Sequence, residues 1–481
     1  MTEAAADSNY CSSFSNIYGG SNMFMEDTIA AISTAMSDGG IGIIRISGPD
    51  AVKIGNQVFQ PANKNKSLDK MPTYTAAYGK IHKDGKIIDE CIALFMKGPK
   101  SYTGEDVVEI DCHGGVVVVK KVLETIIEAG ARPAEPGEFT KRAFFNGRID
   151  LSQAEAVMDL IYSKNEFAME SSLKQLSGSL KNKINSIRDK ILYEIAFIES
   201  ALDDPEHISL DGYSDKLYEV VKEQKAEIDG LLSTADNGRI LKEGIKTAIV
   251  GKPNAGKSSL LNLLVGEERA IVTDIAGTTR DTLEESILIK GIPLQMIDTA
   301  GIRKTDDIVE KIGIEKAKNA IEKADLVLYV ADSSSNLDDS DFEIMDYLKE
   351  KKTIIILNKS DLDKVVGEEE IKEYLHKDVI TFSAKEETGL DELYEKLESL
   401  FFEGKLNFND EIYITNMRHK NSLKQASDSL NMVFGSIEMG MPEDFFSIDL
   451  TDAYEHLGYI LGESMGEDLV NKIFSEFCMG K

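Results

Sequence analysis

The chain is poor in cysteine and has no long apolar run. Its cysteines stand at Cys11, Cys91, Cys112 and Cys478, and none forms a C-x-x-C pair. This pattern predicts neither a zinc site nor a disulfide framework, and it fits a reducing cytosol. Because no apolar run reaches the length of a membrane span, we expect no membrane partner and a cytoplasmic protein.

The chain also lacks an excess of basic charge. Lysine and arginine total 54 against 84 aspartate and glutamate residues, which gives a formal charge of −30. A surface of this average charge repels polyanions, which argues against a protein that coats DNA or RNA without specificity. Any RNA contact must therefore use a local basic patch or a partner protein.

The first residues lack the features of a targeting segment. Residues 1–24 are rich in Ser, Asn and Gly, and they have neither the basic start nor the apolar stretch of a signal peptide. They also contain no Arg, unlike a mitochondrial transit peptide. We interpret this segment as a disordered extension, or as the product of a start codon placed upstream of Met23 or Met25.

Hydrophobic patterning divides the rest of the chain, which is long enough for roughly three domains. Short β-rich runs between residues 28 and 118, with a helical stretch at 116–129, predict a compact α+β domain. Between residues 151 and 236 an apolar stripe at three- and four-residue steps predicts a long helix that packs on other helices. The stripe comprises Leu180, Ile184, Ile187, Ile191, Ile195 and Ile198.

Residues 245–400 alternate buried strands with helices, which is typical of a doubly wound α/β domain. The helical period returns after about residue 408. An α/β domain between two helical stretches is most simply an insertion into one helical bundle, although the two stretches are alternatively independent caps. The predicted segments are an extension at 1–24, an N-terminal domain at 25–148, a first helical part at 149–243, the α/β domain at 244–405 and a second helical part at 406–481.

The strongest motif runs from Gly251 to Ser258 and matches G-x-x-x-x-G-K-S between a strand and a helix. Its glycines let the backbone wrap phosphates with the N–H groups pointing inward, and the helix N-terminus adds partial positive charge. We expect Lys257 to reach the β- and γ-phosphates of a nucleotide and Ser258 to ligate Mg²⁺.

Two later loops indicate which base is bound. The segment from Asn358 to Asp361 reads N-K-S-D at a strand end, and Ser383-Ala384-Lys385 follows another strand. A carboxylate at Asp361 accepts both the N1–H and the 2-amino hydrogens of guanine, whereas adenine would leave it unpaired at a cost of about 1–3 kcal/mol. The order of motifs therefore predicts GTP and disfavours an ATP-driven enzyme, which equal competition by ATP would support.

Between these motifs lie the residues expected to sense the γ-phosphate. Asp298 is expected to hold Mg²⁺ through water, Gly301 to sense the phosphate through its N–H, and Thr279 to be a second Mg²⁺ ligand. Arg280 has the charge of a transition-state cation, but a surface ion pair is the better interpretation. The predicted GTP-binding residues are Asn254, Ala255, Gly256, Lys257, Ser258, Ser259, Thr273, Asp274, Ile275, Ala276, Gly277, Thr278, Thr279, Asp298, Thr299, Ala300, Gly301, Asn358, Lys359, Ser360, Asp361, Ser383, Ala384 and Lys385.

The residue after D-T-A-G is Ile302, where Ras-like enzymes have the Gln that orients the attacking water. Ile302, the segment TDIAGTTRD and the nucleotide motifs together resemble the MnmE/TrmE family of tRNA modification GTPases. The resemblance extends to GIGIIRISG and SYTGEDVVEIDCHGG near the start, to RPAEPGEFTKRAFFNGRIDLSQAEAV and TNMRHK, and to the terminal FCMGK. It covers nearly everything from about Asp27 to the end.

For the fold, the resemblance implies three parts: a folate-binding-type α+β domain, a helical bundle and an inserted Ras-like P-loop GTPase domain. For hydrolysis it implies K⁺, held by oxygens of Asn254, Thr273, Ile275 and Thr278. A cation beside the phosphates would do the work of an arginine finger. The resemblance also implies that Glu310 positions the attacking water and that two such domains meet across the nucleotide.

In the N-terminal domain the resemblance implies a homodimer and a one-carbon tetrahydrofolate, the 5,10-methylene or 5-formyl derivative. The implied contacts are Arg45, Glu109, Arg148 and Lys481. Arg148 stands where the family usually has Lys, so the charge is kept while the geometry differs. Cys478 is either a functional thiol or a small buried hydrophobic residue.

The activity implied is C5 modification of the wobble uridine of tRNA, giving the carboxymethylaminomethyl or aminomethyl product. The family works with the FAD-containing protein MnmG (GidA) in a heterotetramer or larger complex, so FAD is not expected to bind here. The alternative is an Era/Der-like ribosome-assembly or signalling switch. Failure of purified protein to retain 5-formyltetrahydrofolate would favour that switch.

Overall fold

The computed structural model describes most of the chain. The described residues are 27–63, 65–267, 285–289, 292–297, 310–402, 412–478 and 480. They form two compact units. The first comprises the described residues of 1–158, 175–221 and 428–481, and the second those of 159–174 and 222–427.

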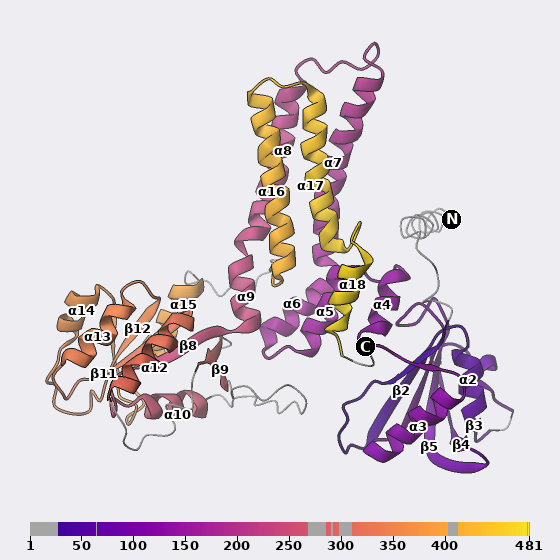
Figure 1. The fold of residues 1–481 in the computed structure, drawn as a ribbon, viewed down its shortest axis with the longest axis horizontal. Helices are drawn as coiled ribbons and strands as arrows, with labels where there is room; N and C mark the ends of the chain where they lie inside the picture. The colour runs from indigo at the N-terminus through magenta and orange to yellow at the C-terminus, as the bar shows by residue number, and fades with distance from the viewer. Residues whose placement is uncertain are drawn as a thin grey trace. The chain divides into compact units, whose positions relative to one another are not determined.

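The first unit contains the expected N-terminal sheet, drawn in indigo and violet in Figure 1. Seven strands lie in the order β3-β4-β5-β6-β2-β1-β7, and every pairing except β1 with β7 is antiparallel. The strands are β1 (Ile29–Ile32), β2 (Ile41–Ser47), β3 (Phe59–Pro61), β4 (Thr75–Lys83), β5 (Lys86–Met96), β6 (Val107–His113) and β7 (Arg132–Pro133). The five β-rich runs recognised in the sequence correspond to β1, β2, β4, β5 and β6, whereas the short β3 and β7 carry too few residues to show a period.

One face of this sheet is apolar because alternate strand residues point to the same side. Gly42, Ile44 and Ile46 of β2 are buried. The helices α2 (Ala51–Val58) and α3 (Val116–Glu128) contribute to the same hydrophobic core as Ile44 and Ile46. The opposite face therefore carries the intervening residues, including Arg45, which is paired with Glu109 of β6 across the ladder.

The C-terminal tail packs on the helix that follows the sheet. Aromatic residues of α4 (Glu138–Phe145) share a hydrophobic cluster with Phe474 and Phe477, which lie at and just beyond α18 (Glu467–Ser475). Gly137 precedes α4 with φ of 68°, and a Cβ there would lie 2.5 Å from the carbonyl oxygen of Phe474. Glycine is therefore required at this close approach.

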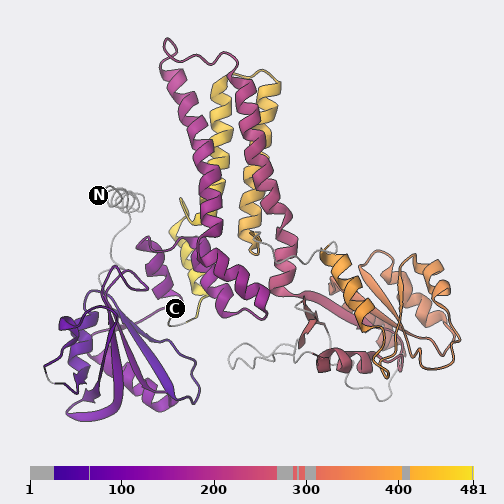
Figure 2. The same ribbon diagram turned by 180° about the vertical axis from the view of Figure 1, so that it is seen from behind.

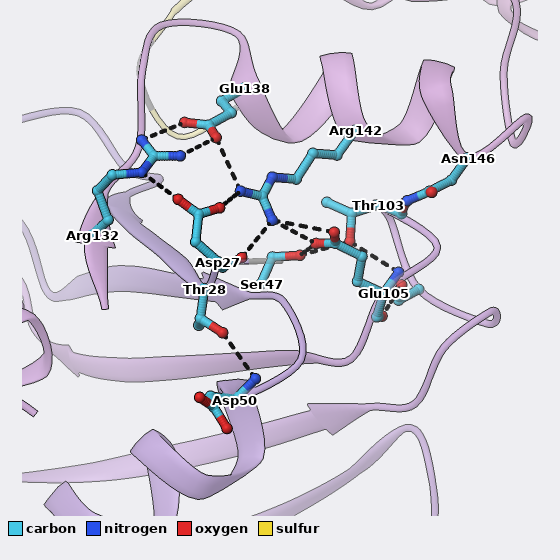
Figure 3. A network of polar contacts seen from close by, with 11 residues as sticks. Asp27, Thr28, Ser47, Asp50, Thr103, Glu105, Arg132, Glu138, Arg142 and Asn146 are labelled. Carbon is cyan, nitrogen blue, oxygen red and sulfur yellow. Dashed lines mark hydrogen bonds and ion pairs between the residues drawn. The ribbon is translucent and has the colours of Figure 1, made fainter. Parts of the chain in front are cut away.

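A partly buried ion network joins Asp27, just before β1, to α4 (Figure 3). Arg142 is 3% exposed, and its guanidinium donates to Asp27 at 2.6 Å, to Glu138 at 3.0 Å and to Glu105 at 3.1 Å. Arg132 donates to Asp27 at 2.6 Å and to Glu138 at 2.5 Å. Two guanidinium groups thus hold three carboxylates together, which ties α4 to the sheet.

Long helices make up the rest of the first unit. The helix α7 (Ser179–Asp203) packs along α17 (Glu443–Leu461), and the two lie side by side in both ribbon views (Figures 1 and 2). The predicted stripe of α7 is confirmed, since all its members are buried except the half-buried Ile195. Arg188 donates to both carboxylate oxygens of Glu463 and lies 4.1 Å from the ring centroid of Tyr454.

Further helices span the limits of the two units. They are α5 (Leu151–Ile161), α6 (Glu166–Leu176), α8 (Tyr213–Ser233) and α16 (Met417–Glu438), while α9 (Ala235–Glu243) lies in the second unit. Within the second unit, Ser427 donates to Asp229 at 2.8 Å and Lys420 to Asp236 at 2.6 Å. These bonds join the start of α16 to the end of α8 and to α9.

The second unit contains a six-stranded sheet in the order β13-β12-β11-β8-β10-β9. Its strands are β8 (Ile245–Val250), β9 (Glu285–Ile289), β10 (Ile292–Met296), β11 (Leu326–Asp332), β12 (Thr353–Asn358) and β13 (Val379–Thr381). All pairings are parallel except β9 with β10. The edge strand β9 was not predicted: its ESILI run has only five residues, although Gly291 follows it in the sequence.

Helices cover both faces of this sheet, as the doubly wound pattern predicts. Residues of α10 (Lys257–Glu267) and α15 (Leu390–Phe402) form one core with Leu328 and Val330. Residues of α12 (Glu310–Lys323), α13 (Asp339–Leu348) and α14 (Glu368–Leu375) form another with Val327 and Tyr329. Alternate residues of β11 thus serve opposite cores, which explains its continuous apolar run.

The Arg142 network generates a stability prediction. Burial alone would raise the pKa values of Asp27 and Glu138, but hydrogen bonds from Arg132 and Arg142 outweigh it and hold both pKa values below normal. Arg142→Met leaves buried carboxylates short of a partner and is expected to cost about 3–5 kcal/mol. Hydrogen exchange of the β1 and β2 amides in the intact chain would measure this loss.

The pH dependence has a defined sign. A carboxylate whose folded pKa is lowered stabilises the fold above its unfolded pKa, and this contribution disappears as pH falls through the folded value. The difference in unfolding free energy between wild type and Arg142→Met should therefore be largest at pH 7 and shrink below about pH 4. Lys121→Met, which removes an exposed lysine paired with Glu124, is the control and should change exchange little. Equal protection in Arg142→Met and wild type at pH 7 would contradict the prediction.

Candidate functional site

The predicted phosphate cradle joins β8 to α10 through backbone that only small or strained residues allow. Gly251, Asn254 and Gly256 have φ values of 145°, 63° and 100°. A Cβ on Gly251 would lie 2.2 Å from the carbonyl oxygen of Val330, and one on Gly256 would lie 2.0 Å from the amide nitrogen of Asn358. The two glycines are therefore needed both for the turn and for the approach of neighbouring strands.

Lys257 is bent back over this loop. Its ammonium group donates to the carbonyl oxygens of Gly251 at 2.8 Å and of Lys252 at 2.5 Å. Burial lowers the pKa of Lys257 to about 8, and its hydrogen-bond partners among the described residues are these neutral carbonyls. A nucleotide phosphate would supply the missing counter-charge, so the loop fits the group that its sequence predicts.

Asn358 connects the cradle to the base-reading loops. This side chain is buried at the end of β12, and its amide nitrogen donates to the carbonyl oxygen of Ala255 at 2.9 Å. Its amide oxygen accepts from the N–H of Ala384 at 3.1 Å. One side chain thus fixes the distance between the phosphate end and the base end of the predicted site.

Asp361 lies beside the loop that begins at Ser383. The Ser383 hydroxyl donates to one carboxylate oxygen of Asp361 at 2.8 Å, and the Lys385 ammonium lies 3.6 Å from the other. The bond from Ser383, assisted by the charge of Lys385, lowers the pKa of Asp361. The carboxylate therefore stays ionised at neutral pH and can accept the two guanine hydrogens.

Lys359 adopts a left-handed conformation, with φ of 63°. Its ammonium group lies 2.6 Å from a carboxylate oxygen of Asp332 at the end of β11, and its carbonyl accepts from the Ser333 hydroxyl at 3.0 Å. Ser360 donates its N–H to the carbonyl of Phe382 at 3.1 Å. All of N-K-S-D is therefore anchored to the ends of neighbouring parallel strands.

An ion pair that no sequence motif marks anchors the cradle itself. Lys252 forms ion pairs with Asp341 at 2.5 Å and with Asp338 at 2.8 Å, at the start of α13. Asp341 is 2% exposed and also accepts from the Tyr329 hydroxyl at 3.0 Å. No motif marks these acids, because they are joined to the cradle only when β11 lies beside β8.

Several predicted residues lie outside the described part of the chain. They are Thr273, Asp274, Ile275, Ala276, Gly277, Thr278, Thr279, Asp298, Thr299, Ala300 and Gly301. Glu310 is the first residue of α12, and Ser258 and Ser259 stand in the first turn of α10. Among the described residues no group of three His, Cys, Asp or Glu side chains could hold a metal ion.

A second cluster lies in the N-terminal domain. Arg45 donates to Glu109 at 2.7 Å and to the carbonyl oxygen of Gly480 at 3.2 Å. Arg45 and Arg148 both lie against the ring of Tyr102, at 5.4 and 5.0 Å from its centroid. The structure thus brings together Arg45, Glu109 and Arg148, whereas Lys481 lies outside the described residues.

The place of Tyr102 in that cluster and the backbone contacts of the C-terminal tail were not predicted. Tyr102 sits where the two guanidinium groups meet, and its carbonyl accepts from Arg148 at 2.9 Å. The Ser33 hydroxyl donates to the carbonyl of Gly480 at 3.1 Å. Cys478 is partly buried, and its carbonyl accepts from the Gly137 N–H at 3.2 Å. The tail is thus held by its backbone, a contact that side-chain patterns do not reveal.

The cradle and the base-reading loops lie at the carboxyl ends of parallel strands in one sheet, where nucleotides bind in doubly wound folds. Their geometry defines a P-loop GTPase, a hydrolase that acts on GTP. Within the described residues, no helix is long and apolar enough to span a membrane.

Comparison with known proteins identifies the family of GTPases to which the chain belongs. Residues 28–148 match the family model of the GTP-binding protein TrmE N-terminus, and residues 151–478 match that of the MnmE helical domain. The tRNA modification GTPase MnmE of Lachnoclostridium phytofermentans is 56% identical over 455 residues, covering 95% of this chain and 99% of the relative. That of Clostridioides difficile is 50% identical over 464 residues, covering 95% and 100%. The chain belongs to the MnmE/TrmE family of tRNA modification GTPases, as its motifs predict.

Among solved structures, the G domain of the T. maritima FeoB iron transporter is 31% identical, covering 32% of this chain and 96% of that domain, with a TM-score of 0.24. Membership of the GTPase family implies GTP as substrate and Mg²⁺ as its companion ion.

Base selection is testable at Asp361. Asp361→Ala removes the acceptor of two guanine hydrogens and should weaken GDP binding by at least about 2 kcal/mol, roughly 30-fold. Titration with a fluorescent guanine nucleotide would measure the change. Asp363→Ala, which removes an exposed acid two residues away, is the control and should bind as wild type does. Unchanged affinity in Asp361→Ala would remove its assigned role.

The lowered pKa of Lys257 predicts proton uptake on nucleotide binding. At pH 8 about half of the unliganded protein carries a neutral Lys257, and a bound phosphate favours the charged form. Lys257 should therefore contribute an uptake of about 0.5 proton to GDP binding at pH 8 and almost none at pH 6.5. Calorimetry in buffers of different ionisation enthalpy measures this number.

The matched variant for this experiment is Lys257→Arg, whose guanidinium stays charged at both pH values. At saturating nucleotide it should show no uptake that is attributable to residue 257. The assignment fails if wild type takes up no proton at pH 8, or if Lys257→Arg takes up as much as wild type does.

Proposed function

We propose that this chain is the GTP-hydrolysing component of the complex that modifies C5 of the tRNA wobble uridine. The supporting observation is the Asn358 bridge, which joins a phosphate cradle to a guanine-type carboxylate loop in a member of the MnmE/TrmE family. The product in this proposal is 5-carboxymethylaminomethyl- or aminomethyl-uridine.

In this proposal the chain's own residues make three contributions to GTP hydrolysis: they hold the phosphates and Mg²⁺, position the attacking water and bind K⁺. The cradle and Lys257 hold the phosphates, while Ser258 and Thr279 are the proposed Mg²⁺ ligands. Ile302 cannot orient water, so Glu310 at the start of α12 is the proposed positioning group. Oxygens of Asn254, Thr273, Ile275 and Thr278 are the proposed ligands of K⁺, which would add positive charge beside the phosphates when bound.

The cluster around Tyr102 is the proposed folate site. Its guanidinium groups suit the carboxylates of a folate tail, and Glu109 suits the amino-pyrimidine edge of a pterin. Support comes from the convergence of Arg45, Glu109 and Arg148 with the chain's tail. Lys481, which follows Gly480, is the fourth proposed contact, and the derivative is 5,10-methylene- or 5-formyl-tetrahydrofolate.

The proposed architecture is a GTPase domain at 244–405 inserted into one helical bundle formed by 149–243 and 406–481. Packing of α7 on α17 and the bonds from α16 to α8 and α9 support the single bundle over two independent caps. The proposed assembly is a homodimer through residues 25–148 that works with FAD-containing MnmG on tRNA in the cytoplasm. Paired GTPase domains would close around GTP and open after hydrolysis.

The test is the wobble nucleosides of cells that lack this protein. Mass analysis should show loss of the C5-aminomethyl-type nucleosides, restoration by the wild-type chain, and no restoration by Glu310→Ala. Glu315→Ala, an exposed residue of the same helix, is the matched control and should restore modification. Unchanged nucleosides in the deletion strain would exclude the proposed function, and restoration by Glu310→Ala would exclude the role of that residue.

A further inference from the structure

A lysine-lined pocket lies on the second unit, away from the phosphate cradle and the base-reading loops. Its volume is about 330 Å³, and its lining includes five lysines. They are Lys349, Lys351, Lys352, Lys377 and Lys396. The acids in the lining are Glu350 and Asp378. This local excess of positive charge is unexpected in a chain with a formal charge of −30.

The pocket lies at the amino ends of strands β12 and β13, whereas the base-reading loops follow the carboxyl ends of the same strands. Thr353, in the lining, is the first residue of β12, whereas Asn358 is the last. Lys377 and Asp378 likewise precede β13, whereas Ser383 follows it. Six residues of β strand span roughly 20 Å, so a single nucleotide bound at the base-reading loops does not reach the pocket.

Carboxylates neutralise two of the five lysines. Lys349 forms an ion pair with Asp346 at 2.7 Å, and Lys396 forms one with Asp378. Among the described residues, the hydrogen-bond partners of the other three are neutral carbonyls, although the Asp236 carboxylate lies near enough to Lys352 to feel its charge. Lys351 donates to the carbonyl oxygens of Glu322 and Ala324 at the end of α12, at 2.9 and 3.3 Å.

The remaining two lysines follow the same pattern. Lys352 donates to the carbonyl of Leu400 in α15 at 3.2 Å and lies 4.4 Å from the ring centroid of Phe401. Lys377 donates to the carbonyl of Lys351, and burial lowers its pKa. Carbonyl oxygens orient these ammonium groups but carry only partial charge, and none of the three lysines forms an ion pair within the described residues. An anion in the pocket would therefore stabilise all three.

We propose that this pocket binds backbone phosphates of the tRNA substrate, through Lys351, Lys352 and Lys377. The inference rests on the proposed function, which makes tRNA the polyanion that this protein must meet. Because the average surface repels RNA, a concave group of lysines held by carbonyls rather than by carboxylates is a place where RNA phosphates would gain affinity. Its distance from the guanine-type loops lets GTP and tRNA bind together.

The test is the affinity of the full chain for an unmodified tRNA transcript, measured by fluorescence anisotropy as salt is varied. The variant is Lys351→Gln/Lys352→Gln/Lys377→Gln, because a Gln amide can still donate to the carbonyls while its charge is gone. We expect a roughly 10- to 100-fold loss at 0.1 M salt, and a decrease of about 2–3 in the log–log salt slope. GTP turnover without tRNA should stay at the wild-type rate.

Two matched triple variants separate charge at this place from charge in general. Replacing the same lysines by Arg keeps the charge and should restore tRNA affinity. Replacing Lys53, Lys121 and Lys372 by Gln changes the net charge equally, but these lysines already pair with acids, so affinity should stay within about twofold. If the Gln triple variant fails to fold, the single change Lys377→Gln should lower the slope by about 1.

Several results would overturn the inference. One is tRNA binding by the Gln triple variant with wild-type affinity and slope. Another is a loss of affinity for a poly-glutamate peptide but not for tRNA, which would make the pocket a dock for an acidic protein. Wild-type protein that binds no tRNA would also reject it, whereas the wobble-nucleoside assay decides separately whether the proposed function stands.

Discussion

The buried amide of Asn358 is the interaction on which the predicted nucleotide site depends. It donates to the cradle at Ala255 and accepts from the loop at Ala384, so it sets the spacing between phosphate and base. Both partners are backbone groups, which a change of side chain cannot remove. The close approach of Asn358 also explains why Gly256 cannot carry a Cβ. A buried amide left without these partners would cost about 1–3 kcal/mol per unpaired group.

The two ends of the predicted nucleotide site have opposite effects on a charged side chain: the phosphate end disfavours the charged form of Lys257, and the base end favours the charged form of Asp361. At the phosphate end, burial lowers the pKa of Lys257, whose ammonium group donates to carbonyl oxygens of the cradle, so a phosphate there would favour the charged form. At the base end, Ser383 and Lys385 stabilise the charge of Asp361, so its carboxylate stays ready to accept hydrogens. The cation is destabilised and the anion is stabilised before any ligand arrives. Binding is thereby driven at the phosphates and made selective at the base.

Structural features that depend on local sequence patterns could be predicted from the sequence. The strand endings at Gly251, Asn358 and Ser383 were recognised because glycine, motif order and apolar runs coincide there, and the stripe of α7 follows a strict helical period. The Lys252–Asp341 pair and the place of Tyr102 beside Arg45 were missed, because they join segments far apart in the chain. The Gly480 carbonyl that Arg45 and Ser33 contact carries no signal either, since every residue has a carbonyl. Tertiary contacts of this kind appear only when the backbone is placed.

The strand β12 has a further consequence, since it begins at the lysine pocket and ends at Asn358. It is buried throughout and paired on both sides, so it is a stiff connection between two places where ligands of like charge would bind. Any free energy that couples these places is reciprocal by thermodynamic necessity. If the nucleotide state alters RNA affinity by some factor, RNA alters nucleotide affinity by the same factor. The coupling between the lysine pocket and the nucleotide loops, which β12 connects, would then have the same sign in both directions.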